Sequence, residues 1–382
     1  MKDAPKQPKK IRVAVLFGGQ SQEHAVSLAS AQSVMRALDP ARYDVVPVGI
    51  TREGRWLAGG NPMQQLRGGP SEDAAETEGP EESIALAPAP GGPTAIVEGA
   101  GHAIGGVDVV FPVLHGPFGE DGTIQGMLEL AGIPYVGSGV LGSALGMDKI
   151  AMKAVFESYG LPVGPYIAVS RHEWEHNPSA VLRRAELALH YPMFAKPANL
   201  GSSVGISKIH GPDEFTAAVD RAAAYDRRIL IEEGIVGREI ECSVLGNDDP
   251  RASVCGEIVA KREFYDFAAK YLEDSSELHI PAEVSPEVSD RIRALAVAAF
   301  QAVDAAGLAR VDFFLRRSDG AVFLNEINTL PGFTSISMYP KLWEASGLSY
   351  SDLVSRLIDL ALERAADRQR RPPPDEGTSV NV

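Results

Sequence analysis

The sequence predicts an α/β amino-terminal domain, a parallel sheet covered by helices, followed by α+β domains built on antiparallel sheets. Before residue 149, short apolar runs alternate with helical patterns, which is typical of a parallel sheet buried on both faces. Beyond residue 149, strand-like runs come in pairs joined by short turns, which is typical of antiparallel hairpins. The length of 382 residues agrees with two or three domains, since a domain commonly holds about 100–200 residues.

Charge and cysteine content exclude several classes of protein. Asp and Glu number 51 against 36 Lys and Arg, and the resulting net charge of −15 repels nucleic acids and anionic membranes. No apolar run approaches the roughly 18–20 residues of a membrane span. Cys242 and Cys255 are too few for a disulfide framework. We therefore expect a cytoplasmic protein that binds neither nucleic acid nor membrane.

The amino-terminal domain (1–148) begins with a buried strand. Ile11–Phe17 is almost entirely apolar and ends in two glycines, and Gln20–Leu38 then carries apolar residues at helical spacing. Two more apolar runs predict further strands, at Asp44–Ile50 and Val107–Leu114. This alternation favours a parallel sheet, whose ligands bind beyond the carboxyl ends of the strands.

Two loops of this domain follow predicted strands and are expected to line a site: Gly18–Glu23 and His115–Thr123. Glu23 begins a helix, so complementing the helix dipole is an alternative role for it. His115 lies between an apolar strand and a glycine-rich turn, and a purely structural role stays open for this residue as well.

Two segments offer little apolar surface to bury. Residues 59–105 are rich in Gly, Pro, Ala and acidic residues, and we interpret them as a low-complexity insertion or surface loop, with a functional lid as the alternative. The polar, proline-containing tail 367–382 is predicted to be disordered.

The remaining chain divides into a central domain (149–240) and a carboxy-terminal domain (241–366). The predicted central elements are the strands Tyr191–Lys196, Ile206–Ile209 and Arg228–Glu233 and the helix Asp213–Ala224. The predicted carboxy-terminal elements are the strands Arg238–Leu245, Ala252–Val259, Val311–Leu315 and Val322–Asn328 and a helix at about 286–306.

A glycine- and serine-rich loop (197–205) follows a strand that ends in Lys196. Glycines let backbone N–H groups approach a phosphate, serines add donors, and the lysine neutralises phosphate charge. A flexible hairpin turn is the alternative for the loop taken alone. It is not a Walker A loop, because no Gly-Lys-Ser/Thr follows at the required spacing.

Oxygen-bearing side chains recur on the last predicted hairpin. Glu326 and Asn328 are two residues apart and therefore point to one side of their strand, and a turn at 318–320 brings Asp312 close to them. Mg²⁺ binds such hard oxygen ligands together with substrate phosphates. A solvated strand face is the alternative, mainly for Asp312.

Other candidates are weaker when taken singly. Glu232 and Glu239 stand at strand ends, Lys149 lies on a predicted helix, and Lys270 and Tyr271 belong to a polar, aromatic segment (264–274). Each also has an ordinary structural explanation: a surface acid, a solvated helix residue, or a loop packed against its own domain.

The order of these features along the chain resembles the ATP-grasp superfamily, and the finer motifs resemble the D-alanine–D-alanine ligases of bacterial peptidoglycan synthesis. The resemblance covers about residues 10–365. The matching stretches are GGQSQEHAVS (18–27), FPVLHGPFGEDGTIQG (111–126), MDK (147–149), KPANLGSSVGISK (196–208), EEGIVGREIE (232–241), FYDFAAKYLED (264–274), ARVDFF (309–314) and NEINTLPGFTSISMYP (325–340).

The resemblance implies a set of residue roles. ATP would be bound by Lys149, Lys196, Gly201, Ser203, Glu232, Glu239 and Lys270. Two Mg²⁺ (or Mn²⁺) ions would be held by Asp312, Glu326 and Asn328. Catalytic roles would fall to Glu23, Ser202, Tyr271, Arg310, Gly332 and Ser337. The D-alanines would contact Glu23, His115, Ser337 and the backbone of Met338. Leucine is common in the family where Met338 stands, but a backbone contact tolerates this change.

The implied reaction has two steps, and the implied assembly is a homodimer. The first D-alanine carboxylate attacks the γ-phosphate of ATP to give an acyl phosphate, and the amino group of the second D-alanine then displaces phosphate. One alternative is a D-alanine–D-lactate ligase, against which Tyr271 argues because its hydroxyl belongs to the dipeptide-forming network. Another is an ATP-binding module without catalysis, against which the complete set of metal ligands and Arg310 argues.

Overall fold

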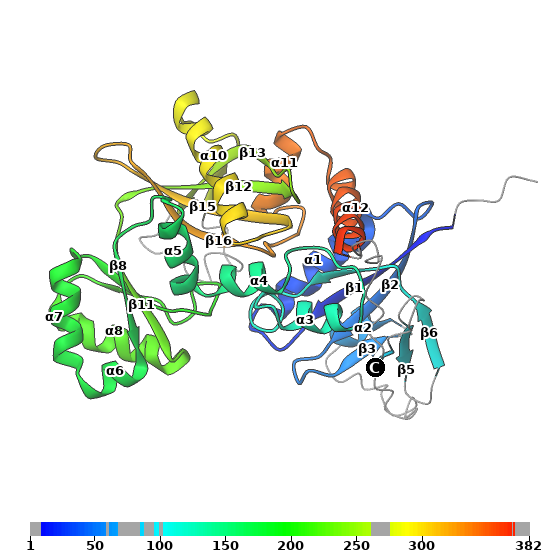
Figure 1. Cartoon of the computed structure of the whole chain (residues 1–382), viewed down its shortest axis with the longest axis horizontal. Helices are drawn as coiled ribbons and strands as arrows, with labels where there is room; N and C mark the ends of the chain where they lie inside the picture. The colour runs from blue at the N-terminus through cyan, green and yellow to red at the C-terminus, as the bar shows by residue number, and fades with distance from the viewer. Residues whose placement is uncertain are drawn as a thin grey trace, which may run out of the picture.

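The computed structural model describes residues 9–58, 61–67, 85–87, 95–98, 102–260, 276–368 and 370. Figure 1 shows three main units: an amino-terminal unit in blue and cyan, a central unit in green and a carboxy-terminal unit in yellow and orange. Across the described part of the chain, no helix is both long and apolar enough to cross a membrane.

The amino-terminal sheet has the strand order β3-β2-β1-β7. β1 (Ile11–Gly18) runs parallel to β2 (Tyr43–Ile50) and to β7 (Val109–Val113), while the edge strand β3 (Trp56–Ala58) is antiparallel to β2. Residues 13–17 of β1 are buried completely or almost so, because both faces of the sheet are covered.

Helices cover both faces of this sheet. On one face, α1 (His24–Ala37) and the last helix of the chain, α12 (Tyr350–Arg368), share a core with the odd-numbered residues of β1. On the other face, α3 (Thr123–Leu130) packs against Ala14 and Leu16. The chain therefore returns to its first domain at the end, and Figure 1 shows α12 beside α1.

Part of residues 59–105 has regular structure. The described elements are α2 (Pro62–Arg67) and a small antiparallel sheet of order β4-β5-β6, formed by Ala85–Ala87, Ala95–Glu98 and His102–Gly106. For these residues the prediction of a loop is wrong, because short runs such as Ala-Ile-Val-Glu still pair as strands between their glycines and prolines. The rest of the segment, like most of the tail 367–382, lies outside the described residues.

The central sheet has the order β10-β9-β11-β8, and every neighbouring pair is antiparallel. Its strands are β8 (Tyr166–Ser170), β9 (Met193–Pro197), β10 (Ser207–Ile209) and β11 (Arg228–Glu233). One face packs against three helices, α6 (Arg171–His176), α7 (Pro178–Ala188) and α8 (Pro212–Tyr225). Because side chains alternate along a strand, the opposite face is left to present Lys196 and Glu232.

The carboxy-terminal sheet has five antiparallel strands in the order β14-β13-β12-β15-β16. They are β12 (Gly237–Gly246), β13 (Arg251–Ala260), β14 (Ser276–His279), β15 (Gly307–Arg316) and β16 (Val322–Asn328). The associated helices are α4 (Val140–Met147), α5 (Lys149–Ser158), α10 (Pro286–Ala302) and α11 (Met338–Ala345).

The predicted combination of an α/β amino-terminal domain with antiparallel α+β domains is confirmed. α4 (Val140–Met147), expected in the domain 1–148, packs against β16, and α12 (Tyr350–Arg368), expected mostly in the domain 241–366, shares the core of the amino-terminal sheet. Two limits of the central domain also differ from the prediction. The chain crosses from the central to the carboxy-terminal sheet at residues 234–236, ahead of the boundary expected at 240/241. Met152 and Phe156 of α5 belong to the carboxy-terminal core, although this helix was placed in the central domain. In both cases tertiary packing, which local patterns do not encode, decides the outcome.

Candidate functional site

A cavity of about 1440 Å³ lies where the three units meet. Every predicted site residue within the described part of the chain lines it. These are Glu23, His115, Lys149, Lys196, Gly201, Ser202, Ser203, Glu232, Glu239, Arg310, Asp312, Glu326, Asn328, Gly332, Ser337 and Met338. Lys270 and Tyr271, with the rest of 261–275, lie outside the described residues.

On the central side of the cavity, Glu232 is clamped between two lysines. Its carboxylate lies 2.5 Å from Lys196 Nζ and 3.2 Å from Lys153 Nζ, and its side chain is only 8% exposed. Burial alone would raise the pKa of Glu232, but the two ammonium groups outweigh it and lower the pKa to about 2. Lys153, Lys196 and Glu232 together have a net charge of +1, and all three side chains are largely buried.

The glycine- and serine-rich loop is held in a strained conformation. Ser202 and Ser203 have φ angles of 50° and 60°, in the left-handed region that non-glycine residues rarely adopt. Lys149 Nζ donates to the carbonyl of Leu200 at 2.8 Å, and the Ser202 hydroxyl donates to the Glu23 carboxylate. The loop is therefore fastened both to α5 and to the amino-terminal domain.

On the carboxy-terminal side, the paired strands bring the predicted metal ligands together. Asp312 on β15 lies directly opposite Glu326 on β16, and Arg310 lies opposite Asn328. Arg310 donates through Nε and Nη2 to the two Asp312 oxygens, each at 2.7 Å. Lys149 Nζ lies 3.7 Å from a Glu326 oxygen. Both carboxylates thus face cationic partners in the same cavity.

The amino-terminal domain contributes a buried histidine. His115 Nδ1 lies 3.1 Å from the carbonyl oxygen of Leu330 and 3.6 Å from a Glu120 carboxylate oxygen, and its Nε2 lies 3.3 Å from Ser30 Oγ. Burial lowers the pKa of His115, but the hydrogen bond and charge of Glu120, together with the charge of Glu23, raise it overall.

The segment from Leu330 to the start of α11 lies beside this histidine, since Ser30 Oγ contacts both His115 Nε2 and the backbone N–H of Phe333. Ser337 precedes this helix at the N-cap position, and its hydroxyl bonds back to Thr334, at 2.7 Å from Oγ1 and 3.1 Å from the backbone nitrogen, instead of capping the helix. A β-carbon added at Gly332 would lie 3.2 Å from Ser337 Oγ, so glycine at this position leaves the space beside the Ser337 hydroxyl unfilled. Met338 is 6% exposed and packs over Gly256.

Sequence reasoning missed three charged residues of this site. Lys153 and Glu120 contact predicted residues directly, and the buried carboxylate of Glu241 lies 3.0 Å from Arg310 Nε. Glu241 follows Glu239 at the strand period of two, and Lys153 follows Lys149 at the helical spacing of four. Both spacings place the pair on one face and were available as signals.

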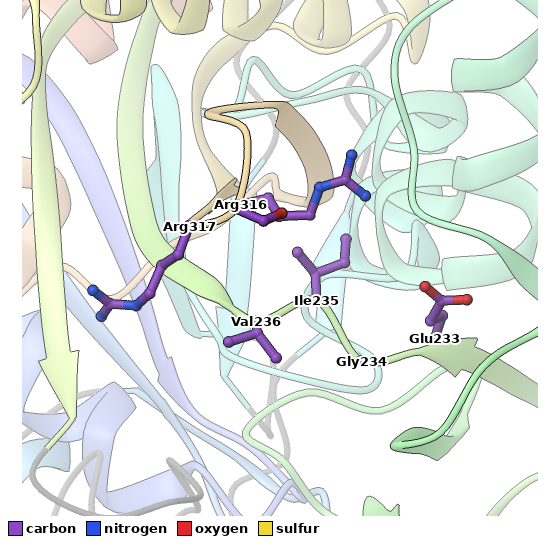
Figure 2. A pocket seen from close by; sticks show the side chains of 7 residues that line it. Glu233, Gly234, Ile235, Val236, Arg316 and Arg317 are labelled. Atoms are coloured by element: carbon purple, nitrogen blue, oxygen red, sulfur yellow. The ribbon is translucent and has the colours of Figure 1, made fainter.

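A second cavity, of about 410 Å³, lies at the connection between the central and carboxy-terminal sheets. Figure 2 shows Ile235 and Val236 between Glu233 and the turn that carries Arg316 and Arg317, whose side chains extend to opposite sides. Arg316 is already paired with Asp319 at 2.6 Å. None of the predicted site residues line this cavity.

Two antiparallel sheets that face each other across buried lysines, a glycine- and serine-rich loop and paired strand carboxylates define an ATP-dependent ligase of the ATP-grasp class. Known proteins agree with this class. The family described as "D-ala D-ala ligase N-terminus" matches residues 12–138, and "D-ala D-ala ligase C-terminus" matches residues 155–359. The chain therefore belongs to the D-alanine–D-alanine ligase family, as its motifs predict.

Individual relatives support the same assignment. The D-alanine–D-alanine ligase of Geobacillus kaustophilus is 52% identical over 364 residues, with 94% of this chain and 97% of the relative covered. That of Deinococcus radiodurans is 52% identical, with 93% and 99% covered.

Solved structures agree as well. The D-alanine–D-alanine ligase from Coxiella burnetii has a TM-score of 0.80 at 38% identity, with 95% of this chain and 97% of that chain covered. The VanG D-Ala:D-Ser ligase from Enterococcus faecalis also has a TM-score of 0.80, at 37% identity, with 92% and 100% covered.

Proposed function

We propose that the large cavity is the active site in which this ligase joins two D-alanines at the expense of ATP, forming ADP, phosphate and D-alanyl-D-alanine. One observation carries this assignment. Lys196 and Glu232 of the central sheet, with the buried Lys153 of α5 against the same carboxylate, stand on one side of a cavity large enough for a nucleotide and two amino acids, and a row of carboxylates on the carboxy-terminal sheet lines the other side. Such a pair of surfaces suits a triphosphate on one side and its counter-ions on the other.

ATP binding is assigned to the central side. Lys196 and Lys149 would contact the phosphates, and the loop with Gly201 and Ser203 would close over them. Supporting this, the loop is glycine- and serine-rich, lines the cavity beside Lys149 and Lys196, and is held by Lys149 at the Leu200 carbonyl. Glu232 and Glu239 would meet the adenine amino group and the ribose hydroxyls.

The donor set of the carboxy-terminal side suits two Mg²⁺ (or Mn²⁺) ions. Asp312 and Glu326 stand opposite each other and Asn328 follows, which supplies hard oxygen ligands from adjacent strands. Among the described residues, no three His, Cys, Asp or Glu side chains converge closely enough to hold a metal ion. The ions would therefore share their remaining ligands with phosphate oxygens and water. When bound, they neutralise the charge of the transferring phosphoryl group.

The protein's own residues then perform orientation and charge stabilisation. Glu23 and His115 would hold the first D-alanine so that its carboxylate points at the γ-phosphate. Arg310 and the backbone N–H of Gly332 would stabilise the tetrahedral oxyanion formed when the second amino group attacks the acyl phosphate. Ser337 and the Met338 backbone would hold the second carboxylate at the start of α11.

Water must be excluded while the acyl phosphate exists. The Ser202–Glu23 contact supports this requirement, because it joins the phosphate-binding loop to the amino-terminal domain across the cavity. Tyr271 would extend the same contact, and Lys270 would approach the transferred phosphate. Both assignments rest on the family motif alone.

The protein is further proposed to act as a homodimer in the cytoplasm, where ATP is supplied. One observation supports that compartment: both cysteines, Cys242 and Cys255, are buried free thiols.

Product analysis tests the proposed function. With ATP, Mg²⁺ and D-alanine, we expect stoichiometric phosphate and D-alanyl-D-alanine. D-Lactate or D-serine, each added with D-alanine, should yield little mixed product. Dominant mixed product would assign a depsipeptide or D-Ala:D-Ser activity instead, and nucleotide binding without turnover would leave only a binding module.

A further inference from the structure

Three carboxylates stand in one row across adjacent strands of the carboxy-terminal sheet. Glu241 on β12 is opposite Asp312 on β15, and Asp312 is opposite Glu326 on β16. Directly opposed residues share a face, and neighbouring strands are about 4.8 Å apart. Two members of the row are deeply buried, with Glu241 at 7% and Asp312 at 14% side-chain exposure.

Arg310 lies within this row and is contacted by two carboxylates at one edge. Its Nε lies 2.7 Å from an Asp312 oxygen and 3.0 Å from Glu241 Oε2, while Nη2 donates to Asp312 at 2.7 Å. The Nε atom carries a single hydrogen, so full hydrogen bonds to both acids cannot coexist. Asp312 therefore accepts the Nε hydrogen, and Glu241 lies beside the same nitrogen as an ion-pair partner that could accept it instead.

This arrangement gives Arg310 two available partners, of which only one belongs to the proposed metal site. A divalent ion at Asp312 would compete with the guanidinium for the same two oxygens. An arginine without a second acceptor would then either resist the ion or leave its place, because a buried guanidinium needs a compensating charge.

We propose that Glu241 is a positioning residue that accepts the Nε hydrogen of Arg310 when Asp312 turns to a divalent cation. Arg310 then stays in the cavity beside the reacting groups while Asp312 becomes a ligand. The inference rests on the proposed function, since it uses the metal site assigned there. It explains why a third acid, outside the predicted metal ligands, is buried against the same arginine.

The test measures Mn²⁺ affinity directly, by electron paramagnetic resonance of the full-length enzyme saturated with a non-hydrolysable ATP analogue. Glu241→Gln should weaken Mn²⁺ binding by about 10- to 100-fold, the usual effect of losing a residue that orients a metal ligand's environment. In an Arg310→Met background, the same Glu241→Gln change should have no effect, because no guanidinium competes for Asp312. Glu241→Asp, which keeps the charge but shortens the reach, serves as a second variant.

A matched control comes from the same sheet. Arg238 donates through Nε and Nη2 to Glu257 at 2.7 and 2.6 Å, and neither residue lines the large cavity. Glu257→Gln should lower the melting temperature and leave Mn²⁺ affinity unchanged.

Two results would overturn the positioning role. The first is an unchanged Mn²⁺ affinity in Glu241→Gln. The second is an equal loss of Mn²⁺ affinity with and without Arg310, which would mean that Glu241 attracts the cation by its charge alone and not through Arg310. Failure of the unmodified enzyme to bind Mn²⁺ with the nucleotide analogue would instead reject the metal site itself.

Discussion

The two sides of the large cavity both bury ionic clusters, but with opposite balance. On the central side two lysines surround one carboxylate, Glu232, whereas on the carboxy-terminal side one arginine serves Asp312 and Glu241. The first cluster has a spare positive charge and the second a spare negative one. Buried charges are costly unless a charge of opposite sign compensates them. The excess positive charge on the central side therefore suits an anionic ligand, and the excess negative charge on the carboxy-terminal side suits a cation.

The largest effect on turnover is expected from removing a carboxylate on the carboxy-terminal side of the cavity. Glu326→Ala removes one of the opposed carboxylates, and turnover should fall by about a thousandfold, equivalent to about 4 kcal/mol of transition-state stabilisation. Stability should change little, because this carboxylate is 30% exposed and its lysine partner is 3.7 Å away. Steady-state kinetics and denaturant unfolding measure the two quantities, with the exposed Glu344→Ala as control. A near-normal kcat would contradict the metal assignment.

The positive side should respond differently. Lys196→Met leaves a neutral Glu232–Lys153 pair, so the free energy of unfolding should fall by less than the about 3–5 kcal/mol that an uncompensated buried charge costs. Adding Glu232→Gln should lower the free energy of unfolding further, because Lys153 is then a buried ammonium without its carboxylate. ATP affinity should stay at least about tenfold weaker in both variants, because the ammonium of Lys196 is gone. Calorimetry separates the outcomes, and full recovery of ATP binding in the double variant would contradict a phosphate-binding role.

A third cluster sharpens the comparison, because its charge depends on pH. Glu120 keeps the pKa of His115 above its ordinary value of 6.5, so the imidazolium and its contribution to stability are fully present below pH 6.5. Both are lost as pH rises through the raised pKa. We expect the KM for the first D-alanine to rise over the same range.

Glu120→Gln should lower the pKa of His115 and shift that rise to lower pH. Histidine ring signals in NMR spectra and the pH dependence of KM report the shift. Glu129→Gln, which alters an acid bonded to Tyr135 outside the cavity, is the matched control and should leave the profile in place. If the pH dependence of KM is unshifted in Glu120→Gln, His115 does not contribute to binding of the first D-alanine.

Much of this arrangement could be predicted from local sequence. The strand period places Glu326 and Asn328 on one face, and a hairpin turn at 318–320 brings Asp312 opposite Glu326. The strands β4–β6 were not predicted from the acidic, glycine-rich composition of 59–105, because composition indicates average burial and not which strands pair.

The electrostatic balance could not be predicted, because it depends on contacts between distant segments. Glu-x-Glu at 239–241 shows that two acids share a face, but not that Arg310 lies beside the second. Likewise, Lys153 meets Glu232 only after the central sheet and α5 have packed together. Residues 270 and 271 lie outside the described chain, so their roles stay predictions.

The smallest effect is expected where the substituted side chain is uncharged and the proposed contact is made by the backbone. Met338 is proposed to bind the second substrate through its backbone, and its side chain packs over Gly256, the residue opposite Glu241. Met338→Leu nearly conserves volume, so stability should change by less than about 1.5 kcal/mol. The KM for the second D-alanine should stay within about twofold, since the backbone N–H is retained. Ser337→Ala, at the preceding residue, supplies the contrast: it removes a hydroxyl proposed to bind the substrate carboxylate and should raise that KM about tenfold. Equal effects of the two changes would mean that the Met338 side chain, rather than the start of α11, defines the second-substrate site.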